Sequence, residues 1–96
     1  MHSFEITHPT LQSWKDSSQS YTLIDIREKE EREAGHMGGS WIPLSELGER
    51  LLELPENTVV FYCRSGARSL MAAKRIRELL HREDIYSLAG GMLARP

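Results

Sequence analysis

Residues 58–69 read Thr58-Val59-Val60-Phe61-Tyr62-Cys63-Arg64-Ser65-Gly66-Ala67-Arg68-Ser69, an apolar run that passes directly into a short polar segment. β-Branched and aromatic residues at positions 58–62 predict a buried strand. From Ser69 to about His81, apolar residues recur at helical spacing, on Leu70, Ala73, Ile76, Leu79 and Leu80. The stretch therefore predicts a strand, a loop over residues 63–68, and a helix.

Strand and helix patterns alternate on both sides of this stretch. Further strands are predicted over residues 4–6, 21–26, 40–42 and 85–88, and helices over residues 9–16, with Thr7 as N-cap, and 28–34, which Gly35 ends. Such alternation is typical of a mainly parallel sheet with helices on its faces. Since the chain has 96 residues, 40% of them hydrophobic, we expect residues 1–96 to form one small α/β domain.

Two other segments have simple structural interpretations. Leu44, Leu47, Leu51 and Leu52 recur at helical spacing before Pro55, which predicts a helix with these leucines in the core. The charged residues 28–34 are typical of a solvated helix face, and His36 is interpreted as a surface or structural histidine.

Composition narrows the function classes. The formal net charge of −2, from 12 basic and 14 acidic residues, gives no strong field toward nucleic acid or an anionic membrane. No apolar run approaches the roughly 20 residues that span a bilayer, and Met1 to Glu5 lack the regions of a signal peptide. We expect a cytoplasmic protein with neither a nucleic-acid nor a membrane partner. The single cysteine excludes an internal disulfide, a CxxC pair and a multi-thiolate metal site.

Cys63 is the candidate nucleophile, because ligands of open α/β sheets bind beyond the carboxyl ends of the strands. The pKa of a thiol falls near cations and helix N-termini, and Arg64, Arg68 and the following helix supply both. Gly66 permits a positive φ, so that with Ala67 the loop backbone could form an anion-binding nest. A lone cysteine after an apolar strand is more often inert core, but its polar neighbours here argue against that.

The remaining loop residues admit two interpretations each. Arg64 or Arg68 taken alone would be a solvated surface arginine, although both flank one cysteine. Ser65 could donate to the thiolate or shape a turn, and Ser69 could support the thiolate or serve as an N-cap. Asp25 and Arg27, at the end of the strand over residues 21–26, are further candidates for a supporting role.

Four segments together resemble the rhodanese homology domain. They are Leu23-Ile24-Asp25-Ile26-Arg27-Glu28; Gly35-His36-Met37-Gly38-Gly39-Ser40 with Ile42-Pro43-Leu44-Ser45-Glu46-Leu47; Val59 to Ser69; and Leu88-Ala89-Gly90-Gly91. The resemblance implies a five-stranded parallel sheet flanked by helices. Many relatives continue through a final helix, whereas this chain stops at Pro96, so with this shortened C-terminus we expect part of one sheet face to be less covered.

The resemblance also implies a reaction. Rhodaneses move a sulfane sulfur from a small anionic donor such as thiosulfate to a thiophilic acceptor such as cyanide, a thiol or a protein thiol. By this resemblance Cys63 corresponds to the persulfide-bearing cysteine, and residues 64–68 to the loop that surrounds it. Neither a metal nor an organic cofactor is expected.

Two other functions remain open. A cysteine phosphatase also places a cysteine between strand and helix, but its pattern resembles Cys, five residues, then Arg, whereas Arg68 comes one position early. A non-catalytic module that carries sulfur or binds a partner within an assembly is the third possibility. Uptake of one sulfur atom from thiosulfate separates these hypotheses.

Overall fold

The computed structural model describes residues 4–96, so residues 1–3 of the N-terminal segment lie outside the description. Five strands form one sheet in the order β1-β5-β4-β2-β3, and every paired strand is parallel. The strands are β1 Glu5–Ile6, β2 Tyr21–Asp25, β3 Ser40–Trp41, β4 Thr58–Tyr62 and β5 Ile85–Leu88. The predicted α/β fold with a parallel five-stranded sheet is confirmed.

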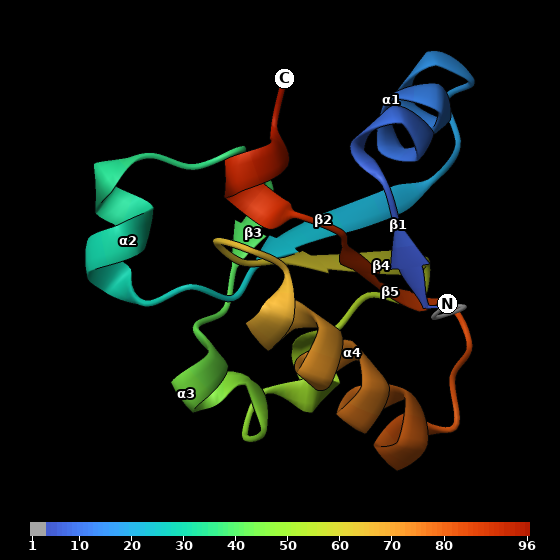
Figure 1. Ribbon diagram of the computed structural model, residues 1–96. Coiled ribbons are helices and arrows are strands. Elements are labelled where there is room, and N and C mark those ends of the chain that lie inside the picture. Colours follow the sequence, from blue (N-terminus) through green and yellow to red (C-terminus); the bar gives the residue numbers. More distant parts are fainter. Residues whose placement is uncertain (1–3) are drawn as a thin grey trace.

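Helices lie on both faces of the sheet. They are α1 His8–Asp16, α2 Lys29–Ala34, α3 Leu44–Leu47 and α4 Ala67–Leu80, with the 3₁₀ turns η1 Leu51–Glu53 and η2 Gly91–Ala94. Figure 1 shows α3 and α4 against one face, α1 and η2 against the other, and α2 beyond the end of β2. Thr7 caps α1 as predicted, since its hydroxyl accepts from the Thr10 amide at 3.3 Å.

The alternation of β4 decides which way Cys63 points. Successive side chains of a strand face opposite sides. Val59, Phe61 and Cys63 belong to the core between the sheet and α4, whereas Val60 and Tyr62 belong to the core on the α1 side. The thiol is thereby directed toward α4.

Two element predictions were wrong in their bounds. The helix after Cys63 begins at Ala67 rather than Ser69, because Gly66 already turns the chain, so Ser69 lies within the helix and is not its N-cap. The leucine segment does not form one helix: α3 stops at Gly48, a poor helix former, and η1 follows. As a result Leu47 is buried, but Leu52 is fully exposed.

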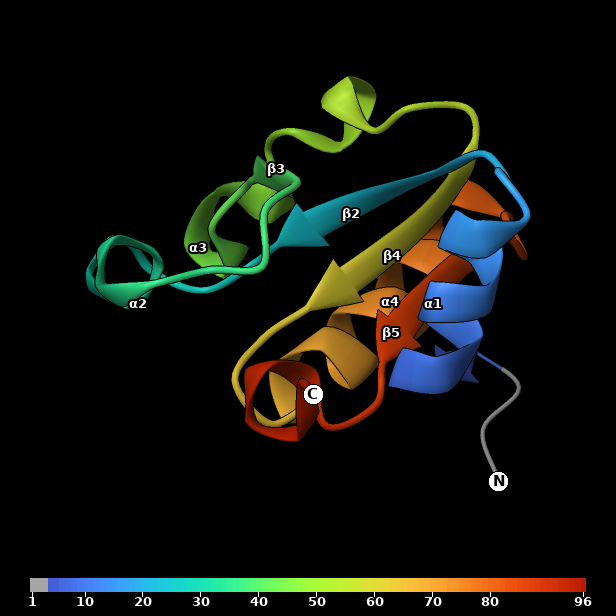
Figure 2. The same cartoon turned by 90° about the horizontal axis from the view of Figure 1, so that it is seen from above.

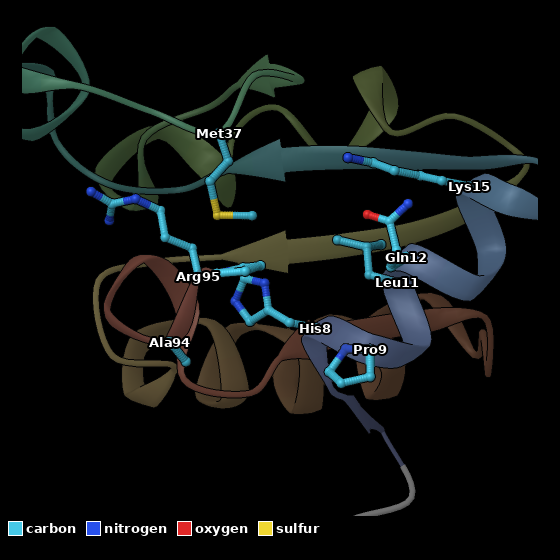
Figure 3. A pocket seen from close by; sticks show the side chains of 9 residues that line it. His8, Pro9, Leu11, Gln12, Lys15, Met37, Ala94 and Arg95 are labelled. Carbon is cyan, nitrogen blue, oxygen red and sulfur yellow. The ribbon is translucent and has the colours of Figure 1, made fainter.

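A cavity of about 550 Å³ lies between α1, Met37 and the last residues of the chain. Figure 3 shows His8 of α1 near Met37 and Arg95 at one end of this cavity, with Gln12 and Lys15 toward the other.

Candidate functional site

The loop between β4 and α4 turns sharply around Cys63. Arg64 and Ser65 are exposed, whereas Cys63 and Gly66 are buried. Gly66 adopts φ +100°, in the left-handed region that a residue with a Cβ rarely occupies, and a Cβ there would also crowd the Gly90 amide. The turn leads directly into α4, and Cys63 therefore lies beside the amino end of a fourteen-residue helix.

Three hydrogen bonds meet at the Cys63 sulfur. The Gly66 amide lies 3.2 Å from Sγ, the Ser69 amide 3.4 Å and the Ser69 hydroxyl 3.5 Å. Burial raises the pKa of the Cys63 thiol, but the Ser69 hydroxyl and the amides of Ser69, Gly66 and Arg68 outweigh it. The pKa consequently lies below that of an ordinary cysteine, because these donors stabilise the anionic form of the sulfur.

Ser69 connects the sulfur to β5, the strand that pairs with β4. Its Oγ is 2.7 Å from the hydroxyl of Ser87 in β5 and 3.2 Å from the Gly66 carbonyl oxygen. Both serines are fully buried. The Ser69 hydroxyl donates its one proton to the Gly66 carbonyl oxygen, so the thiol of Cys63 donates to Ser69 Oγ; once the sulfur is ionised, the same proton can turn toward it instead. Ser87 was missed by sequence reasoning, since one serine in a strand has no pattern of its own.

Arg68 forms a two-point ion pair with Glu31 of α2. Both its terminal nitrogens lie 2.7 Å from the carboxylate oxygens. The guanidinium lowers the pKa of Glu31 to about 2, and it also interacts with the Cys63 thiol. The interpretation of residues 28–34 as a solvated face thus missed Glu31. The signal that could have found it is the Glu28–Glu31 spacing of a capping box, in which the Glu31 carboxylate accepts from the Glu28 amide at 3.2 Å.

The other loop residues have different surroundings. The side chain of Arg64 is exposed, and its carbonyl accepts from the Leu93 amide at 2.9 Å. Ser65 Oγ accepts from the Ala67 amide at 3.5 Å, which supports the turn-shaping interpretation of Ser65. Ala67 is exposed in the first turn of α4. Arg64 therefore offers a solvent-facing cation at the loop, while Arg68 is shared with a carboxylate.

Asp25 and Arg27 lie beside the site and organise its surroundings. Asp25 is fully buried and accepts two hydrogen bonds from the Arg27 side chain at 3.0 Å and one from Arg32 at 3.4 Å. Arg27 also donates to the Gly35 carbonyl at 2.6 Å. The network fixes both ends of α2. Its connection to Cys63 is indirect, through Glu31 and Arg68.

The segment after β5 packs against the cysteine loop. The Met92 amide donates to the Cys63 carbonyl and the Leu93 amide to that of Arg64, both at 2.9 Å. A Cβ at Gly91 would collide with the Cys63 carbonyl oxygen, so glycine is required for this close approach. Figure 2 shows η2 next to the loop that follows β4. This contact gives Gly91 a physical role.

A family model described as "Rhodanese-like domain" matches residues 8–94. The chain belongs to the rhodanese-like domain family. This rhodanese-like chain is 36% identical over 93 residues to the "Probable adenylyltransferase/sulfurtransferase MoeZ" of Mycobacterium tuberculosis, covering 93% of the chain and 24% of that protein. It is 40% identical over 76 residues to the "Putative sulfur carrier protein YrkF" of Bacillus subtilis, covering 77% and 41%. The chain thus spans less than half the length of these curated relatives.

A solved relative matches the rhodanese-like chain along nearly its whole length. The human single-domain sulfurtransferase TSTD1 aligns with a TM-score of 0.75 and 28% identity, covering 94% of this chain and 92% of that one. The recognition of the rhodanese homology domain is confirmed.

Within residues 4–96 no helix is long and apolar enough to cross a membrane. In the same range, His, Cys, Asp and Glu side chains form no group of three that could hold a metal ion. His36 is exposed, and its ring nitrogen accepts from the Gly38 amide at 2.9 Å, in agreement with a surface interpretation.

Proposed function

We propose that this rhodanese-like chain is a sulfurtransferase in which Cys63 holds a sulfane sulfur as a persulfide. The observation that supports it most is the set of hydrogen bonds at Sγ: the amides of Gly66 and Ser69 donate to the sulfur, the Ser69 hydroxyl lies beside it, and together they lower the pKa of the thiol. A thiolate is the nucleophilic form of cysteine. The membership in a family that includes sulfurtransferases points to the same chemistry.

The proposed cycle has two displacements. The Cys63 thiolate attacks the outer sulfur of thiosulfate, a bond forms between Sγ and that sulfur, and the bond to the sulfonate group breaks with its electron pair leaving on sulfite. Cyanide or a thiolate then attacks the outer sulfur of the persulfide. The bond between Sγ and that sulfur breaks, which returns the Cys63 thiolate.

The loop residues have separate tasks in this proposal. Exposed Arg64 attracts the anionic donor, and the amides of Gly66 and Ser69 stabilise negative charge on sulfur. Arg68 attracts the donor less than an unpaired arginine would, because Glu31 neutralises much of its charge. Since Cys63 is fully buried, the outer sulfur of the persulfide is the atom that meets the acceptor.

We propose a thiol, free or on a protein, as the natural type of acceptor, and the cytoplasm as the compartment. A reducing compartment keeps acceptor thiols available. The relative named "Putative sulfur carrier protein YrkF" supports transfer to another molecule.

A steady-state assay tests the proposal against its rivals. We expect thiocyanate to form from thiosulfate and cyanide, no hydrolysis of an aryl phosphate, and no activity in Cys63→Ala. Phosphate release without thiocyanate would overturn the proposal in favour of a phosphatase. Absence of both reactions in a folded protein would favour a non-catalytic binding module.

A further inference from the structure

An apolar groove lies between α3, η1 and α4, on the face of the molecule that α4 covers. Its volume is about 400 Å³. Leu44 and Leu51 line one side, and Met71 and Leu79 of α4 line the other. The groove exists because Gly48 ends α3 after one turn, which leaves the adjoining surface of α4 without a continuous helical neighbour.

Three of the apolar residues that line the groove are exposed, above a floor of buried ones. Met71 is 74% exposed, Leu79 48% and Leu44 38%. Contiguous apolar residues at a surface mark interaction sites, whereas scattered ones need no explanation. Burying such side chains against a partner removes apolar surface from water and so favours binding. This surface is therefore suited to an apolar occupant.

The charges along the groove have one sign. The ionisable side chains that line it are Arg68 and Arg75, and none of the described residues that line it is acidic. Arg68 has Glu31 as its counter-ion, whereas Arg75 is exposed on the outer face of α4. The complementary occupant combines apolar side chains with carboxylates.

The groove also reaches the cysteine site. Arg68 lines the groove at the amino end of α4 and interacts with the Cys63 thiol. Arg68, Arg75 and Leu79 are seven and four residues apart, so they lie on one face of the helix. A segment bound along this face would have one end beside the cysteine loop.

We propose that this groove binds an acidic, apolar segment of the protein that accepts sulfur from Cys63. The inference rests on the proposed sulfur transfer and adds the chemistry of its partner. The segment would place its apolar side chains against Met71 and Leu79, and a carboxylate against Arg75.

Short synthetic peptides with a terminal cysteine test the proposal. The acidic peptide contains leucines and glutamates. The basic peptide keeps the same leucines and has lysine in place of each glutamate. With persulfide-loaded protein we expect the acidic peptide to accept sulfur about tenfold faster than the basic one. Met71→Glu and Arg75→Glu should each remove this preference. The matched controls Leu52→Glu and Lys74→Glu, which lie off the groove, should keep it.

Direct binding separates this proposal from sulfur transfer itself. Fluorescence anisotropy of labelled peptides on Cys63→Ala should show the same preference for the acidic peptide, lost in the Met71→Glu and Arg75→Glu backgrounds. Equal binding of both peptides would overturn the docking proposal even if thiosulfate still loads Cys63. A dimer in sedimentation that Met71→Glu dissociates would also overturn it, because a second copy would then occupy the groove. Failure of thiosulfate to load Cys63 would instead contradict the proposed function.

Discussion

The Cys63 thiol lies between opposing influences on its pKa. Burial raises the pKa, whereas the hydroxyl of Ser69 and nearby amides lower it. Arg68 adds positive charge close to the sulfur, but its ion pair with Glu31 offsets part of that charge. Removing the charge of Arg68 and removing the charge of Glu31 should therefore move the pKa of the Cys63 thiol in opposite directions.

Arg68→Ala should raise the pKa of Cys63, because it removes a cation and leaves Glu31 unpaired. Glu31→Gln should lower it, because Glu31, whose pKa is about 2, is anionic at every pH of the assay. The pH dependence of the rate of thiol alkylation measures both effects: the midpoint should move up in Arg68→Ala and down in Glu31→Gln.

The control for this pair is Glu30→Gln, which removes an exposed carboxylate from the same helix. Its alkylation profile should match that of the unmodified protein. Midpoints that shift in the same direction in Arg68→Ala and Glu31→Gln would show that the pair acts by holding the loop rather than through charge.

At the scale of elements, the sequence predicts strands better than helix ends. The apolar run at positions 58–62 matches β4 because five consecutive residues fit a strand covered on both faces. The start of α4 was predicted two residues too late. A glycine permits a positive φ but does not show whether the chain enters a helix directly after it, as it does after Gly66. The leucine periodicity failed for a related reason: spacing does not show that Gly48 ends the helix.

The buried network around Asp25 stabilises the α2 element that presents Glu31. Asp25→Asn leaves Arg27, which is only 5% exposed, without its buried counter-ion. Removing one partner of a buried ion pair costs about 3–5 kcal/mol. We expect the free energy of unfolding, from urea denaturation at neutral pH, to fall by this amount.

Asp84→Asn is the matched control, because it makes the same Asp-to-Asn change in an ion pair with arginine, Arg82–Asp84, that is more exposed. Exposed ion pairs contribute about 0–1 kcal/mol. If Asp25→Asn lowered the free energy of unfolding no more than Asp84→Asn does, the network around Asp25 would not stabilise α2 as proposed.

At the scale of the molecule, the site is assembled from the carboxyl ends of three neighbouring strands. β2 leads to Asp25 and Arg27, β4 leads to Cys63, and β5 leads through Leu88 to the segment that packs on the cysteine loop. The order of these segments along the chain predicts their meeting, because parallel strands end at one edge of a sheet.

The contacts between those segments could not be predicted in the same way. Glu31 and Arg68 are 37 residues apart, and Ser69 and Ser87 are 18 apart. Local periodicity has no information about such pairs. The sequence thus indicates which loop contains the candidate nucleophile, while the side chains that adjust the pKa of its thiol follow only from the folded arrangement.

Intact-mass measurement after incubation with thiosulfate tests the central claim most directly. The protein should gain the mass of one sulfur atom, lose it again on addition of cyanide, and show neither change as Cys63→Ala. A folded protein whose mass is unchanged by thiosulfate, or which gains sulfur equally without Cys63, would contradict a Cys63 persulfide.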